Sequence, residues 1–165
     1  MIHQESPIRL HLLRHADAGD PDAWEGPDDI RPLSPKGHRQ AERLAALLAG
    51  SGFAPDAILS SPMTRARETA EIVGAALGRP VRVEPRLAGP LELETVEAIL
   101  ADAGDPARPV LVGHDPEFSA LACELTGATS LQLRKGTFAR IDVERPLQFG
   151  EGVLRWLVPP DLLRP

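Results

Sequence analysis

Apolar residues recur at every second position in the first patterned stretch of the chain. Ile8, Leu10 and Leu12 alternate with polar neighbours, which predicts a β-strand over residues 8–13. The polar stretch that follows, residues 17–32, is rich in Asp, Gly and Pro and fits neither the strand nor the helix period. We therefore expect a long loop beside the end of the first strand, a position where loops often carry function.

A helical period begins directly after this loop. Ser34 and Pro35 are typical of a helix start, in which a capping hydroxyl precedes a proline at the first helical position. Apolar residues then recur three and four positions apart until Gly50, which predicts an amphipathic helix.

The strand-then-helix pattern repeats along the chain. Further strands are predicted at 57–60, 81–83 and 110–112, and further helices from a cap at Ser61-Pro62 to Gly78, over about 94–103, and from Asp115-Pro116 to about 125. The last two apolar runs, 138–143 and 153–158, have the strand period and are joined by a turn, which predicts an antiparallel hairpin.

This alternation predicts an α/β fold of the three-layer sandwich type. We expect a mainly parallel central sheet, helices on both of its faces and the hairpin at its C-terminal edge. A length of 165 residues with 42% hydrophobic residues fits one core, and no linker interrupts the pattern, so we expect a single domain over residues 1–165.

Charge and composition narrow the function classes. The net charge of −6 argues against nucleic acid and anionic membranes as partners, because both would be repelled at long range. No apolar run approaches the roughly 20 residues that cross a bilayer, so we expect a cytoplasmic protein. Cys123 is the only cysteine, which excludes an internal disulfide and a thiolate zinc site within one chain.

Charged side chains follow three of the predicted strands. Arg14 and His15 come after the first, Arg65 lies in the helix after the second, and His114 comes after the fourth. Ligands of open parallel sheets bind at the carboxyl ends of the strands, beside helix N-termini that favour anions. The sequence therefore predicts a phosphate site built from these four residues.

The two residue types predict different roles. The guanidinium groups of Arg14 and Arg65 and a protonated His114 would hold a phosphate dianion, with each charge-assisted hydrogen bond contributing about 1.5–3 kcal/mol. His15, kept neutral by its cationic neighbours, would have a lone pair available to attack phosphorus and form a phosphohistidine intermediate. This chemistry needs no metal and no cofactor.

Other phosphatase and hydrolase chemistries do not fit the sequence. Thr129 stands six residues after Cys123, where a cysteine phosphatase needs arginine, and neither a Walker A loop nor a Gly-x-Ser-x-Gly turn is present. His11 and His15 lie on and just past a strand, where four residues extend about 13 Å, too far to share one metal ion.

The motifs resemble those of a known family. Four segments match: Leu12 to Ala16, Arg31 to Gly37 followed by Gln40-Ala41, Ser61 to Ala70, and Val112 to Pro116. Together they resemble the histidine phosphatase (phosphoglycerate mutase-like) superfamily and, within it, the small bacterial SixA-type phosphohistidine phosphatases. The resemblance covers nearly the whole chain and implies a transient phosphohistidine at His15, with Arg14, Arg65 and His114 around the phosphate.

Two departures from the superfamily bear on the substrate. Ala16 stands where the wider superfamily has glycine, which disfavours a mutase and fits the SixA-type branch. No general acid is obvious; Asp17, Glu92 and Glu94 are the candidates. A phosphohistidine substrate needs such an acid less than an ester does, because its leaving group is an imidazole.

The leading hypothesis is therefore a phosphatase acting on a phosphorylated protein such as a histidine-containing phosphotransfer domain. One alternative is a phosphomonoesterase acting on a small metabolite such as a sugar phosphate, and another is a non-catalytic module that only binds phosphate. Arg134 and Lys135, in the turn before the hairpin, are interpreted as charges facing water, with contact to a bound partner as the alternative, and are left out of the pocket.

Overall fold

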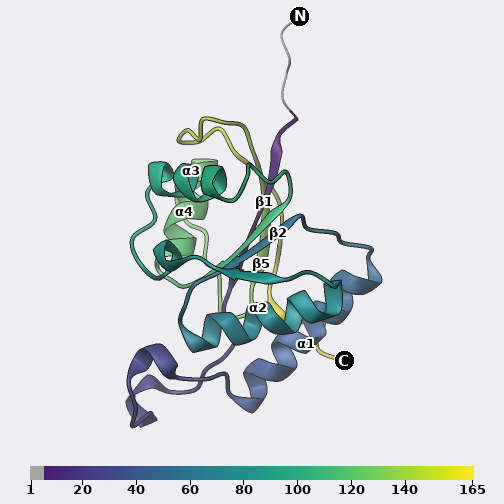
Figure 1. Ribbon diagram of the computed structural model, residues 1–165, viewed down its shortest axis with the longest axis vertical. Coiled ribbons are helices and arrows are strands. Elements are labelled where there is room, and N and C mark those ends of the chain that lie inside the picture. The colour runs from purple at the N-terminus through teal and green to yellow at the C-terminus, as the bar shows by residue number, and fades with distance from the viewer. Residues whose placement is uncertain (1–5) are drawn as a thin grey trace, which may run out of the picture.

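The computed structural model describes residues 6–165 and shows an α/β sandwich (Figure 1). The strands are β1 (Ile8–Arg14), β2 (Ala57–Ser60), β3 (Val81–Val83), β4 (Pro109–Gly113), β5 (Phe138–Val143) and β6 (Val153–Val158). The α-helices are α1 (Pro35–Gly50), α2 (Thr64–Leu77), α3 (Leu93–Asp102) and α4 (Glu117–Thr126). Short 3-10 turns cover Pro21–Ala23, Asp28–Ile30, Pro85–Ala88 and Pro160–Leu163.

The six strands form one sheet in the order β3-β2-β4-β1-β5-β6. The pairs β3–β2, β2–β4 and β4–β1 are parallel, whereas β5 runs antiparallel to both β1 and β6. The carboxyl ends of the four parallel strands therefore meet at one edge, and the C-terminal hairpin closes one side of the sheet as predicted.

Two helical layers cover the sheet, one on each face (Figure 1). On β1, Leu10 and Leu12 face α3 and α4, while Leu13 faces α1 and α2. Strand residues alternate between faces, so neighbouring leucines enter different cores. Among residues 6–165, no helix is both long and apolar enough to cross a membrane.

The expected start of α1 is confirmed, whereas that of α2 is wrong. Ser34 caps α1 by accepting a hydrogen bond from Gly37 N, with Pro35 at the first helical position. α2 instead begins at Thr64 after Met63, without a side-chain cap. Ser61 is fully buried, and its hydroxyl is used elsewhere, as described below.

His11 is a core histidine at the centre of an aromatic cluster. It is 2% exposed, and its ring centroid lies 5.5 Å from that of Phe138, on which it stacks, and 4.8 Å from that of Phe53, in a T-shaped arrangement. Nδ1 lies 3.0 Å from the carbonyl oxygen of Pro109, which makes that nitrogen the protonated one. Burial lowers the pKa of His11 to about 4, so its side chain is neutral at pH 7.

This neutral histidine makes stability depend on pH in a predictable direction. The unfolded chain takes up a proton at His11 near pH 6.5, while the folded chain does not until the pH approaches 4. The contribution of His11 to the free energy of unfolding is therefore fully present above pH 6.5 and is lost as the pH falls from 6.5 toward 4. His11→Phe, which keeps an aromatic ring there, removes this titration.

Between pH 7.5 and pH 5.5, we expect wild type to lose about 1.4 kcal/mol of unfolding free energy relative to His11→Phe. Urea unfolding of both proteins at the two pH values measures it, and the titrations shared by both proteins cancel. If the free energies of unfolding of the two proteins changed equally with pH, the pKa of His11 would not be lowered by folding.

Candidate active site

The end of β1 is held in place by its neighbours on both sides. His15 N donates to Gly113 O at 3.0 Å, and Gly136 N donates to the carbonyls of Arg14 and His15 at 3.1 and 2.9 Å. Arg14 Nη1 donates to the carbonyl of Leu133 at 2.9 Å. The backbone that carries the predicted nucleophile is thus fixed between β4 and the segment leading into β5.

A single threonine ties α2 to this backbone. Thr69 Oγ1 accepts from Ala16 N at 3.1 Å and donates to the carbonyl of Arg65, one turn earlier in α2, at 2.8 Å. Thr69 is fully buried, so both bonds are shielded from water. The first turn of α2, and Arg65 with it, is therefore anchored against the residue that follows His15.

The second predicted histidine lies beside the first. The ring centroids of His15 and His114 are 5.2 Å apart, and the side chains are 5% and 9% exposed. His114 Nε2 lies 2.7 Å from Ser61 Oγ, which also accepts a bond from Met63 N at 3.3 Å. Because this hydroxyl still has its own proton to donate, we assign Nε2 of His114 as the acceptor and Nδ1 as the protonated nitrogen.

His15 is held in one tautomer with one free lone pair. Its Nδ1 lies 2.8 Å from the carbonyl oxygen of Ala16, which can only accept, so Nδ1 carries the proton and Nε2 the lone pair. Burial, reinforced by the nearby charges of Arg65 and Arg14, lowers the pKa of His15 to about 3. The imidazole is therefore neutral across the physiological range, as a nitrogen nucleophile must be.

His114 differs from the sequence expectation. Burial first, and then Arg65 and Arg14, lower its pKa to about 4, so it is neutral in the free protein rather than an imidazolium. A protonated Nδ1 still makes it a hydrogen-bond donor. The positive charges in the pocket are therefore those of the two arginines, and Arg14 Nη1 lies 3.7 Å from Asp115 Oδ2.

Three buried nitrogens in this cluster have no hydrogen-bond partner among the described residues: Arg14 Nε, Arg65 Nε and His114 Nδ1. The fourth such side-chain atom in residues 6–165 is Oγ1 of Thr137. The backbone carbonyl of Thr137 accepts a hydrogen bond from Arg14 N, so this residue also lies beside the pocket. An unsatisfied buried polar group costs about 1–3 kcal/mol. Three donors beside a neutral nucleophile are the arrangement that an anionic ligand would satisfy.

The loop after β1 adds a carboxylate that sequence reasoning missed. Asp28 Oδ2 lies 3.1 Å from Arg65 Nη2, and its carbonyl accepts from Arg65 Nη1 at 2.8 Å. Hydrogen bonding to Arg31, and the charge of Arg65, lower the pKa of Asp28, so it is ionised at neutral pH. The sequence of residues 17–32 follows neither the strand nor the helix period, so no pattern in it signals this contact.

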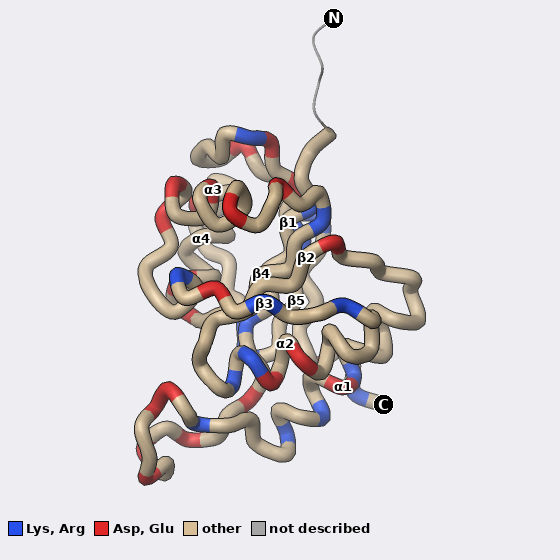
Figure 2. Tube along the Cα trace, in the orientation of Figure 1, with Lys and Arg blue, Asp and Glu red and all other residues tan. Residues whose placement is uncertain are grey.

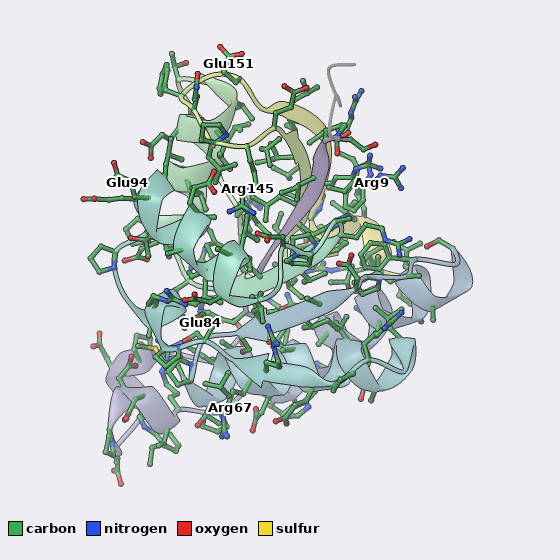
Figure 3. The ribbon with its side chains drawn as sticks, turned by 45° about the horizontal axis from the view of Figure 1, so that its top comes forward. Arg9, Arg67, Glu84, Glu94, Arg145 and Glu151 are labelled. Atoms are coloured by element: carbon green, nitrogen blue, oxygen red, sulfur yellow. The ribbon has the colours of Figure 1, made fainter. Side chains whose placement is uncertain are left out.

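The three candidate acids lie in different surroundings. The Asp17 carboxylate accepts from Ser34 Oγ at 2.5 Å and lies 3.6 Å from Lys135 Nζ, and the Ser34 bond helps to lower its pKa despite partial burial. Glu92 and Glu94 are exposed at the start of α3, where Glu94 points away from the sheet (Figure 3). Within residues 6–165, none of the three forms a hydrogen bond or ion pair with Arg14, Arg65 or either pocket histidine.

Comparisons with known proteins agree with this geometry. The sequence model of the histidine phosphatase superfamily (branch 1) matches residues 10–89. A Mycobacterium tuberculosis protein of uncharacterised function is 36% identical over 68% of this chain and 69% of its own length. Phosphohistidine phosphatase SixA of Escherichia coli is 27% identical over 93% of this chain and 94% of its own.

The solved structure of the protein histidine phosphatase SixA complexed with tungstate superposes with a TM-score of 0.82. It is 26% identical, and the match covers 95% of this chain and all of that one. On these matches, and on the paired histidines and arginines at the strand ends, the chain belongs to the histidine phosphatase superfamily and is a phosphatase.

Proposed function

We propose that this phosphatase removes phosphate from phosphohistidine on a protein, without a metal, through a phosphohistidine intermediate on His15. The observation that carries the proposal is the set of unpartnered donors of Arg14, Arg65 and His114 around a histidine whose tautomer is fixed. Donors held rigidly in a buried site stabilise the charge that develops on the phosphoryl oxygens.

In the first step, the lone pair on His15 Nε2 forms a bond to phosphorus as the substrate N–P bond breaks. Proton balance is simple when the other ring nitrogen of the substrate carries a proton, because the leaving group is then a neutral imidazole. The proton stays on His15 Nδ1, which keeps donating its hydrogen bond to the Ala16 carbonyl, and this bond stabilises the positive charge that the ring acquires.

In the second step, water adds to phosphorus and the electron pair of the His15 N–P bond returns to Nε2. The hydrogens of the water leave with the inorganic phosphate, and His15 is restored in its starting tautomer. Arg14, Arg65 and His114 hold the phosphoryl oxygens in both steps and need not exchange protons.

The carboxylate nearest the pocket arginines favours a leaving group that needs no proton. Asp28, which contacts Arg65, is ionised and cannot act as a general acid. Cleavage of an unactivated ester would release an alkoxide and would benefit from such an acid. Similarity to SixA phosphohistidine phosphatases supports the same choice of substrate.

The intermediate gives a direct test of the proposal. Incubated in EDTA with a histidine-phosphorylated phosphotransfer domain carrying ³²P, the enzyme should release phosphate and carry an acid-labile label on His15. His15→Ala should abolish the label and lower turnover by more than about 10³-fold, because nothing replaces the nucleophile. His38→Ala, the same change at an exposed histidine, is the matched control.

Two other outcomes would each contradict the proposed function, in different ways. Rapid cleavage of sugar phosphates with no release from the phosphoprotein would identify a small-molecule phosphomonoesterase. That enzyme should also lose rate in Asp17→Asn, Glu92→Gln or Glu94→Gln. Phosphate binding without any label would indicate the non-catalytic module.

Asp28 competes with the substrate for Arg65, and this competition can be measured. Asp28→Asn should lower the inhibition constant of inorganic phosphate by about three- to tenfold. The substitution removes a negative charge that repels phosphate and that occupies the guanidinium of Arg65. Asp29→Asn removes the same charge from the neighbouring exposed position. Weaker phosphate inhibition in Asp28→Asn alone would instead show that Asp28 positions Arg65.

A further inference from the structure

A groove leads away from the candidate pocket across the N-terminal half of α1. It consists of two adjoining hollows, each about 400 Å³ or slightly less, that share Lys36, Gln40, Pro160, Asp161 and Arg164. The first hollow has Arg14 in its lining, and the second continues to Arg39 and Arg43. The groove therefore starts at a pocket arginine and ends on the surface of the helix.

The lining of this groove is strongly basic. Lys36, Arg39 and Arg43 stand three and four positions apart, so they share one face of α1 and span about 10 Å of it. Blue segments recur along α1 and reappear at the adjacent C-terminus (Figure 2). The basic residues of the lining are Arg14, Lys36, Arg39, Arg43, Arg134, Lys135 and Arg164, against only Asp17 and Asp161.

Three of these seven cations have no carboxylate partner among residues 6–165, and Lys135 lies 3.6 Å from Asp17. In the part of the chain that the structure describes, no carboxylate lies within 4.0 Å of Lys36, Arg39 or Arg43. Arg134 and Arg164 share the carboxylate of Asp161 at 3.8 and 3.3 Å, in side chains more than half exposed. Exposed ion pairs of this kind contribute about 0–1 kcal/mol, so a stronger anion can replace them.

We infer that this groove, lined by Lys36, Arg39, Arg43, Arg134, Lys135 and Arg164, docks an acidic surface beside the phosphohistidine of the partner protein. The inference rests on the proposed function and adds the surface that would recognise the partner. Arg134 and Lys135, interpreted from sequence as charges facing water, become part of this surface.

The shape of the groove fits a protein better than a metabolite. A site for a second phosphate of a small molecule would hold a few buried, fixed donors close together. Here the cations are long side chains on an open surface, spread over about 10 Å along α1. Such a distribution steers an oppositely charged surface during encounter, which raises association rates by about 10–10³-fold at low salt.

The test reverses the three cations on the helix face that lie outside the phosphate pocket. With a phosphotransfer domain that has acidic residues around its phosphohistidine, Lys36→Glu/Arg39→Glu/Arg43→Glu should lower kcat/KM at least about tenfold, through KM. Its kcat/KM for p-nitrophenyl phosphate should stay within about twofold of wild type. The salt sensitivity of the wild-type rate on the phosphoprotein should also largely disappear in this variant.

A charge-matched control separates docking from net charge. Arg79→Glu/Arg82→Glu/Arg108→Glu makes the same change in net charge on exposed arginines just before β3, within β3 and just before β4. This control should keep wild-type activity on both substrates. Neutralising the acidic residues of the phosphotransfer domain should lower the wild-type rate as much as the groove variant does.

Three results would overturn the inference. An equal loss in the groove variant and the charge-matched control would assign the effect to net charge, and an equal loss on both substrates would assign it to the pocket. Unchanged turnover of the phosphoprotein by the groove variant would remove the docking surface while leaving the proposed function intact. Failure of the wild type to act on any phosphoprotein would instead refute the proposed function itself.

Discussion

The hydrogen bond between His15 Nδ1 and the carbonyl of Ala16 is the contact on which the rest of the site depends. A carbonyl oxygen can only accept, so this one bond places the proton on Nδ1 and the lone pair on Nε2. Two features of the fold maintain it. Gly136 holds the backbone of Arg14 and His15 from the β5 side, and Thr69 holds Ala16 from α2.

The same pocket that protects this tautomer is electrostatically unfavourable when it contains no anion. Two arginines lie beside two buried imidazoles, and three nitrogens have no hydrogen-bond partner among residues 6–165. Asp28 relieves part of this by placing an ionised carboxylate on Arg65 from an exposed loop. Because its side chain is 58% exposed, an incoming phosphate can displace it at little cost. The loop thus contributes a temporary anion rather than a fixed member of the pocket.

Sequence patterns predicted the residues whose position follows from regular structure. Arg14, His15 and His114 follow strands whose periods are clear, and the parallel order of β1, β2 and β4 brings those strand ends together. Ser61 was misinterpreted because a serine before a proline is typical of a helix cap, whereas its hydroxyl is 2.7 Å from His114. Asp28 was missed because a loop without a period gives no register from which a contact can be inferred. The neutral state of His114 depends on burial, which no local pattern reports.

Net charge and local charge lead to different conclusions for this chain. A net charge of −6 argues against general attraction to polyanions, yet the residues beside the pocket carry a clear excess of positive charge. At physiological salt the screening length is about 8 Å, so a partner close to the surface responds to the nearest side chains rather than to the whole molecule. Repulsion from the acidic remainder of the chain disfavours other orientations of an acidic partner. For the acidic partner that we propose, the opposed signs therefore favour the orientation that brings its phosphorylated side chain toward Arg14.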